Sequence, residues 1–204
     1  KPNYATYTSG VNPSVRGLTD DSYGTTSSVD NIYNELNIAG KSGVDYYNGS
    51  ASSDPCGGGS NFSGAYHDAV RYYTDVGATS SSTSTYCNTH DKSLSQFMTD
   101  VNSGNLPAFS VILPTNSEND HDNSVSSGDT WAQNFLNPLF DSNQYKTGDT
   151  AVFYVWDEGG TEVNFIPNVL IAPSVVPGSK VPTPIGNPIS HFAALHTWED
   201  MLGL

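Results

Sequence analysis

The residues best suited to chemistry lie in the segment WDEGG at positions 156–160. Two adjacent carboxylates, Asp157 and Glu158, follow a β-prone run at residues 150–156, and the two glycines after them let a ligand approach the backbone closely. Hard divalent cations prefer carboxylate oxygens, so Asp157 and Glu158 are candidate metal ligands. An acidic turn between two strands is the alternative interpretation.

A histidine flanked by acids, in the segment Asp120-His121-Asp122, is the second candidate. An imidazole can bind a metal or donate a hydrogen bond to an anion, and the carboxylate of Asp120 can add an oxygen ligand. A solvated turn is the alternative, because Asp is common in turns. The apolar run at 108–113 predicts a buried strand just before this loop, and open α/β sheets bind ligands at the carboxyl ends of their strands. That position favours a functional role.

Two further candidates lie near the ends of the chain. His191 follows Ser190 at the start of a predicted helix, and a helix amino terminus attracts anions through its free N–H groups. Asn3 follows a proline, and its amide could donate to an anionic oxygen. Thr8 and Ser9 carry hydroxyl groups, but no base that would activate them is visible nearby. A plain surface segment is the alternative for residues 2–10.

The remaining histidines, His67, His90 and His196, have no partner motif, and we expect ordinary structural or surface roles for them. The chain also contains no Gly-x-Ser-x-Gly turn, phosphate-binding Walker loop or His-Glu-x-x-His helix. The sequence therefore lacks the catalytic motifs of serine hydrolases, nucleoside triphosphatases and zincins.

Helical and strand-like patterns alternate along most of the chain, which is typical of an α/β layer fold. Apolar spacing predicts helices at 29–36, 94–101, 131–139 and 192–202, and β-prone runs predict strands at 44–47, 108–113, 150–156 and 168–172. We therefore expect a three-layer α/β fold with a mostly parallel central sheet and helices on both faces. The length of 204 residues fits one domain, residues 1–204.

Net charge, cysteine content and glycosylation sequences indicate which partners to exclude and in which compartment the protein is expected. Acidic residues outnumber basic ones by 21 to 7, so the net charge is −14, and such a field repels nucleic acids. No apolar run is long enough to predict a transmembrane segment. The two cysteines, Cys56 and Cys87, predict one disulfide, and Asn48 and Asn61 lie in glycosylation sequences, so we expect a secreted glycoprotein.

Taken in order, these segments resemble the secreted phosphoesterase family that contains phospholipases C and acid phosphatases, within the alkaline-phosphatase-like superfamily. The likeness spans nearly the whole chain. The blocks that carry it are Pro2-Asn3-Tyr4 with Thr8-Ser9-Gly10, Leu106-Pro107-Ala108-Phe109-Ser110, Asp120-His121-Asp122, Gly128-Asp129-Thr130-Trp131, Trp156-Asp157-Glu158-Gly159-Gly160, Ser190-His191-Phe192 and residues 197–204.

The resemblance implies hydrolysis of a phosphate ester at one or two divalent metal ions, through a Ser or Thr that becomes transiently phosphorylated. A small phosphate ester or a phospholipid would be the substrate. Matched to the family's motifs, Asp157 and Glu158 correspond to metal ligands, and Asp120 with His121 to the element that contacts the metal or the phosphate. His191 matches the family's late histidine, and Asn3 belongs to the block beside the nucleophile.

The chain departs from the family pattern at its beginning. The family carries a Glu-Asn element that supplies metal ligands, and its nucleophile lies two residues before the proline of the Pro-Asn block, which here falls before Lys1. We expect an upstream segment of the natural protein to supply both. A non-catalytic secreted glycoprotein that keeps the phosphatase scaffold is the main alternative. A Ser- and Tyr-rich adhesive domain is a third.

Overall fold

The computed structural model describes residues 2–12, 14, 27–47, 67–76, 89–160, 165–181 and 189–204. The predicted disulfide and glycosylation residues, Cys56, Cys87, Asn48 and Asn61, lie outside these ranges. Both features therefore stay predictions.

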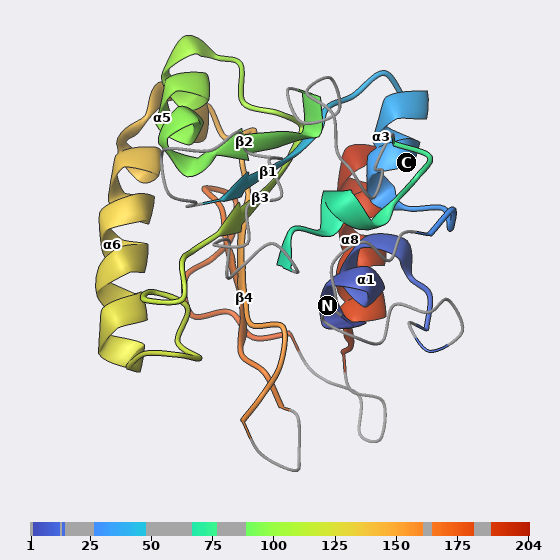
Figure 1. The fold of residues 1–204 in the computed structure, drawn as a ribbon. Coiled ribbons are helices and arrows are strands. Elements are labelled where there is room, and N and C mark those ends of the chain that lie inside the picture. The colour runs from blue at the N-terminus through green and yellow to red at the C-terminus, as the bar shows by residue number, and fades with distance from the viewer. Residues whose placement is uncertain are drawn as a thin grey trace.

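Three parallel strands form the centre of the fold (Figure 1). A mostly parallel central sheet was predicted, but the strand at residues 91–93 was not. Strand β1 (Gly43–Tyr47) lies in the middle, with β2 (Asp91–Ser93) on one side and β3 (Phe109–Leu113) on the other. Gly43 pairs with Phe109 and Tyr47 with Leu113, so β1 and β3 run side by side over their full length. The α/β fold class is confirmed.

Helices on one face of the sheet bury every second residue of β1. Helix α5 (Leu94–Ser103) ends at Gly104, whose φ of 73° makes the left-handed cap that glycine adopts readily. Helix α6 (Val125–Asp141) begins at a Ser124 cap, and the short helix α7 (Asn143–Lys146) follows it. The buried apolar residues of this face are Val44, Tyr46, Phe97, Val101 and Leu139.

Helices on the opposite face enclose a second core (Figure 1). They are α1 (Pro2–Ser9), α3 (Ile32–Ile38), α8 (His191–Leu202) and the 3₁₀ helix η2 (Ala69–Tyr72). The fully buried side chains of this core include Ala5, Ile32, Tyr33, Leu36, Val70 and Tyr73. The sheet is therefore covered on both sides, which explains why β1 is buried along its whole length.

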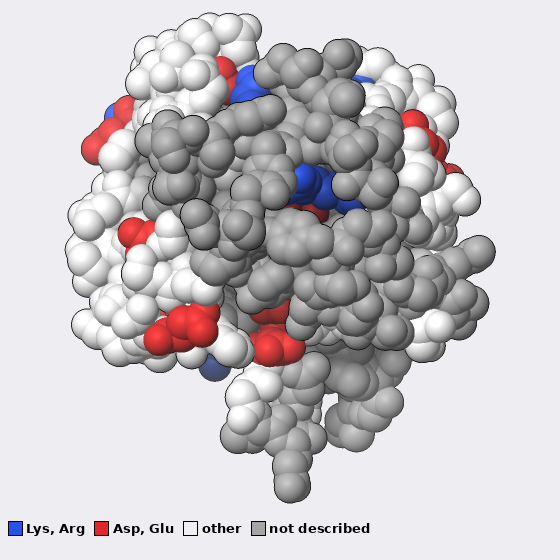
Figure 2. Space-filling view, viewed as in Figure 1, with Lys and Arg blue, Asp and Glu red and all other residues white. Residues whose placement is uncertain are grey.

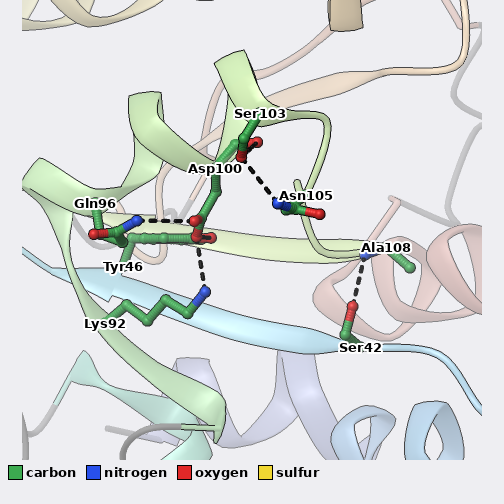
Figure 3. Close-up of polar contacts among 8 residues, drawn as sticks. All are labelled: Ser42, Tyr46, Lys92, Gln96, Asp100, Ser103, Asn105 and Ala108. Atoms are coloured by element: carbon green, nitrogen blue, oxygen red, sulfur yellow. Dashed lines mark hydrogen bonds and ion pairs between the residues drawn. The ribbon is translucent and has the colours of Figure 1, made fainter.

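A polar network joins β1, β2 and α5 on the first face (Figure 3). Asp100 accepts hydrogen bonds from Tyr46 Oη at 2.6 Å, Lys92 Nζ at 2.8 Å and Gln96 Nε2 at 3.0 Å. Each carboxylate oxygen of Asp100 thus has a partner, which offsets the cost of burying its charge. The network ties the helix to two strands.

Strands β4 (Val152–Val155) and β5 (Asn168–Ile171) form a separate antiparallel pair. The sequence predicted both strands but placed them in the mostly parallel central sheet. Residues 156–167 connect the two strands. Antiparallel pairing of two strands needs no helical crossover between them.

The first helix, α1, occupies residues that the sequence pattern predicted as a surface segment. Pro2 stands at the first helical position, where its missing N–H costs nothing, and Ala5 and Tyr7 are buried. The hydroxyl groups of Thr6, Thr8 and Ser9 each donate to the carbonyl four residues earlier. Tertiary packing therefore stabilises this helix although its residues have weak helix propensity.

Among the described helices, none has the length and apolar character needed to cross a lipid bilayer.

Candidate functional site

Two helices from the ends of the chain bind the backbone just after β4. Tyr7 Oη of α1 donates to the carbonyl oxygen of Trp156 at 3.2 Å. His191 Nε2, in the first turn of α8, lies 2.7 Å from the carbonyl oxygen of Asp157. A carbonyl can only accept, so Nε2 carries the proton. The Asp157-Glu158 segment is thereby fixed by elements far away in the sequence.

Glu158 lies next to two other predicted site residues, Asn3 and His121. The Asn3 side-chain amide donates to Glu158 Oε2 at 3.2 Å. His121 Nε2 lies 3.9 Å from Glu158 Oε1, at the edge of ion-pair distance. The carboxylate is half-exposed, and the His121 ring is 71% exposed, so both side chains can be reached from solvent.

The loop that carries His121 is folded by Asn119. Its Oδ1 accepts hydrogen bonds from the backbone N–H groups of His121 at 3.1 Å and Asp122 at 3.0 Å, and its amide donates to Asp122 Oδ2 at 2.9 Å. The bond from Asn119, supported by the adjacent His121, lowers the pKa of the Asp122 carboxyl. This turn is a typical use of an asparagine side chain.

His191 lies in a partly apolar environment that favours its neutral form. Its ring stacks on Tyr7, with 3.9 Å between ring centroids and 24° between ring planes. Burial lowers the pKa of His191, although its bond to Asp157 opposes the shift. A neutral ring with its proton on Nε2 has Nδ1 as the acceptor nitrogen. Burial and the nearby Asp157 raise the pKa of Tyr7, so its hydroxyl stays protonated.

Asp120 and Asp157 were predicted as metal ligands together with Glu158. Trp156 Nε1 donates to Asp120 Oδ2 at 3.3 Å, so this carboxylate faces β4. Within the described ranges, no group of three Asp, Glu, His or Cys side chains could hold a metal ion. Glu158 and His121 form a close pair without a described third ligand. The predicted metal roles of Asp120, Asp157 and Glu158 stay predictions.

Comparison with known proteins identifies the family. The chain matches the Phosphoesterase family over residues 1–189. It belongs to the Phosphoesterase family. The resemblance that the sequence motifs suggested is therefore confirmed.

Curated relatives of this phosphoesterase are phosphatases. The chain is 37% identical to a phosphatidylinositol-3-phosphatase of Mycobacterium tuberculosis over 101 residues, which cover 48% of this chain and 31% of the relative. It is 33% identical over 70 residues to a phosphate-repressible acid phosphatase of Penicillium chrysogenum and to an acid phosphatase of Aspergillus niger. Those matches cover 34% of this chain but only 17% and 16% of the fungal proteins. No solved structure matches the chain.

Sequence reasoning dismissed one histidine that lies near these residues. The ring of His67 lies 5.2 Å from the ring of Tyr4 on α1, and the charge of His67 contributes to the lowered pKa of Asp122. His67 is therefore close to the loop that carries His121. No motif surrounds it in the sequence, so only the tertiary fold identifies it.

The two hydroxyl groups considered as nucleophiles in this phosphoesterase serve the structure of α1. Thr8 is buried, and its hydroxyl donates to the Tyr4 carbonyl and contacts the hydroxyl of Tyr73. Ser9 donates to the Ala5 carbonyl at 2.7 Å. Neither hydroxyl contacts a described base, so neither fits the role of an activated nucleophile.

A polar groove of about 450 Å³ runs along the first turns of α6 in this phosphoesterase. Its lining is formed by the side chains of Ser117, Glu118, Ser126, Ser127, Thr130, Trp131 and Asn134. Ser117 and Glu118 lie in the loop that continues to His121. The groove therefore offers hydroxyl, amide and carboxylate groups beside one aromatic ring.

The described surface carries acidic groups on several elements (Figure 2). In that view, Asp and Glu side chains appear at separate places on the described surface, with few Lys or Arg side chains among them. This agrees with the net charge of −14. An anionic substrate would thus be attracted by local groups at the site and not by the overall field.

Proposed function

We propose that this phosphoesterase hydrolyses small phosphate monoesters at the site around Glu158, in a metal-dependent reaction that proceeds through a phosphorylated Ser or Thr. The observation that carries the proposal is the convergence of Asn3, His121 and Glu158, supported by His191 on the adjacent backbone. These residues come from four separate segments of the chain. Convergence of this kind is expected of a functional site and not of an acidic turn.

Asn3 and the histidines supply the groups that would contact the phosphoryl oxygens. The amide of Asn3 is a hydrogen-bond donor, and the exposed imidazole of His121 can approach an anion from solvent. His67 adds a further imidazole near the same loop. Neutral His191 holds Asp157 through Nε2, and its Nδ1 can accept a proton or a hydrogen bond.

The carboxylates are the reason for including a divalent metal in the proposal. Asp157 and Glu158 would repel a phosphate dianion if no cation stood between them. A divalent cation supplies the charge that neutralises phosphoryl oxygens, and oxygen ligands suit it. The described residues alone do not form a complete metal-binding group, so further ligands would have to come from other parts of the protein.

The nucleophile of the proposed reaction is not Thr8 or Ser9, because both hydroxyl groups are bonded within α1. The phosphorylated intermediate is therefore tested directly. After acid quenching of a reaction of the full-length protein, mass spectrometry should detect one peptide that is heavier by a phosphoryl group and should show which Ser or Thr carries it.

The polar groove along α6 favours a small polar substrate over a lipid. A phospholipid leaving group is an apolar diacylglycerol, whereas six of the seven residues that line the groove carry a hydroxyl, amide or carboxylate group. We therefore propose an acid-phosphatase type of specificity and treat phospholipase C activity as the alternative. The fungal relatives, which are named acid phosphatases, agree with this choice.

The decisive experiment measures phosphate release from p-nitrophenyl phosphate by the full-length protein, with and without added divalent cations. We expect activity that a chelator removes and that Mg²⁺, Ca²⁺, Mn²⁺ or Zn²⁺ restores. Glu158→Gln should reduce kcat/KM by about a hundredfold or more, since it removes both the charge and the acceptor for Asn3. Phosphatidylcholine micelles in a parallel assay distinguish the lipase alternative.

A matched control makes the same substitution, Glu to Gln, at a position outside the site. Glu35→Gln on α3 should leave kcat/KM unchanged, because Glu35 contacts none of the site residues. A full-length protein that folds, binds added cations and still releases no phosphate from any ester would overturn the proposal. It would favour a non-catalytic glycoprotein instead.

We also propose that the protein is secreted and glycosylated, with a disulfide between Cys56 and Cys87. Support comes from the acceptor sequences at Asn48 and Asn61 and from the even number of cysteines. Glycosidase treatment of native protein should lower its apparent mass. Thiol titration of the unfolded protein should find free thiols only after reduction.

A further inference from the structure

Asp120 has a backbone conformation that asparagine and glycine adopt more readily than most residues. Its φ is 60°, and among the described residues no other non-glycine residue has a positive φ. The left-handed conformation costs about 1 kcal/mol or more for a residue with a side chain. Surrounding contacts must therefore hold Asp120 in place.

Trp156 and Gly128 hold the carboxylate of Asp120 between them. Trp156 Nε1 donates to Oδ2 at 3.3 Å, while Oδ1 is buried without a described hydrogen-bond partner. A Cβ atom at position 128 would lie 1.8 Å from Oδ1 and 2.5 Å from Cγ. No residue other than glycine fits there unless the carboxylate moves. We call these contacts of Asp120 with Trp156 and Gly128 the Asp120 clamp.

Glycine at position 128 lowers the stability of α6, and the Asp120 clamp is the feature that explains its presence there. It lies inside α6, where glycine destabilises a helix by about 1 kcal/mol relative to alanine. Its φ is not positive, so the backbone itself does not require glycine. The close approach of the Asp120 carboxylate does require it.

The clamp lies between the two segments that meet at the site. Asp120 directly precedes His121, and Trp156 is two residues before Glu158. His121 Nε2 and Glu158 Oε1 are 3.9 Å apart. A displacement of the Asp120 carboxylate that its side-chain torsions cannot absorb would shift the backbone that carries His121.

We propose that Asp120 is a positioning residue, held by Trp156 and Gly128 so that His121 stays beside Glu158. The proposal rests on the proposed function, because the position of His121 affects turnover only if its imidazole contacts the phosphate. It is an alternative to the role of metal ligand that the sequence suggested for Asp120. It also gives Trp156 and Gly128 defined roles in the site.

The test begins with Gly128→Ala in the full-length protein. A displaced His121 should lower kcat by about tenfold or more with a smaller change in KM, since small displacements of contact groups have large effects on turnover. Gln133→Ala, on an exposed position of the same helix, is the control and should leave kcat unchanged. Trp156→Phe removes the indole donor but keeps an aromatic ring, and should lower kcat in the same way.

A second readout does not depend on activity. The three tryptophans of the chain give indole signals in the ¹H–¹⁵N spectrum that Trp→Phe variants can assign. Gly128→Ala should shift the Trp156 indole signal and speed its hydrogen exchange, while the Trp198 signal stays in place. Nuclear Overhauser contacts between the His121 ring and the Glu158 methylene groups should weaken.

A double-mutant cycle then separates the clamp from a general effect on α6. With Asp120→Ala present, Gly128→Ala should change kcat and the NMR signals by less than about twofold, because the carboxylate that it displaces is gone. Equal losses in both backgrounds, or an unchanged Trp156 signal in Gly128→Ala, would overturn the clamp. If the unmutated protein proves inactive, the proposed function fails while the NMR readouts still decide the clamp.

Discussion

The side-chain amide of Asn3 donates to Glu158 Oε2 at 3.2 Å, so helix α1 and the segment after β4 share a bond across 155 positions of sequence. Asn3→Ala should lower kcat/KM for p-nitrophenyl phosphate by about tenfold, because Glu158 loses a partner that orients it. Asn3→Asp should be more damaging, since it places a second negative charge beside the carboxylate.

The control for this prediction is Asn102→Ala at an exposed position of α5. It makes the same change in the layer on the other face of the sheet and should leave kcat/KM unchanged. Equal activity of Asn3→Ala and the unmutated protein would show that the bond has no part in turnover.

Tyr7 contributes two separable interactions, a stacked ring against His191 and a hydroxyl that donates to the Trp156 carbonyl. Tyr7→Phe keeps the ring and should lower the free energy of unfolding by about 1 kcal/mol, the usual cost of one hydrogen bond. Tyr7→Ala also empties a buried position and should cost about 3–5 kcal/mol. Urea denaturation measures both, and similar losses in the two variants would contradict this division.

Local patterns in the sequence predicted most of the elements that position the site, but not helix α1 and not the contacts between elements. The apolar spacing of α5 and the glycine after it are local signals, and both were confirmed. Helix α1 was missed because its residues have weak helix propensity and its stability comes from burial against α8 and η2. The antiparallel pairing of β4 with β5 was missed because strand patterns alone do not show the direction in which two strands pair.

Within the candidate site, motifs identified the residues around Glu158, because residue type and position after a strand are visible in the sequence. His67 was dismissed, since its proximity to Tyr4 and Asp122 depends on tertiary structure alone. The space that Asp120 occupies beside Gly128 is likewise invisible in the sequence. Residue types were thus predictable and their partners were not.

Three aspartates, Asp45, Asp68 and Asp91, have no exposed surface. Asp45 and Asp91 are paired across β1 and β2, and Asp68 precedes η2 on the same face. Burial, and then the charge of Asp68, raises the pKa of Asp45, although Tyr33 donates to it. Burial, and then the charge of Asp91, raises the pKa of Asp68 despite nearby Arg71.

A raised carboxyl pKa makes the fold more stable in acid. The folded protein keeps protons on Asp45 and Asp68 that the unfolded chain releases near pH 4, so their contribution is complete below that pH and falls as the pH rises toward the folded pKa. Asp68→Asn cannot ionise. Its free energy of unfolding relative to the unmutated protein should therefore rise with pH, by up to about 1.4 kcal/mol per pH unit.

Urea denaturation at intervals between pH 4 and pH 8 measures this difference. Asp149→Asn, at an exposed position, is the matched control and should give a curve parallel to that of the unmutated protein. Parallel curves for Asp68→Asn as well would show that the buried carboxyl is already ionised in the folded state.

Asp100 should show the opposite pH dependence. Burial alone would raise its pKa, but hydrogen bonds from Lys92, Tyr46 and Gln96, together with the charge of Lys92, lower it. The stabilisation is therefore complete above about pH 4 and is lost as the pH falls through the folded pKa. Asp100→Asn should lower the free energy of unfolding at pH 7 by about 2 kcal/mol, and this loss should shrink in acid.

An exposed ion pair provides the comparison for Asp100. Asp141 lies 3.5 Å from Lys146, and both side chains are largely in solvent. Asp141→Asn should change the free energy of unfolding by less than about 0.5 kcal/mol, because exposed pairs are screened and gain little. Urea denaturation of both variants at pH 3 and pH 7 tests the contrast. A loss for Asp100→Asn no larger than that for Asp141→Asn would mean that α5 does not depend on the network joining it to β1 and β2.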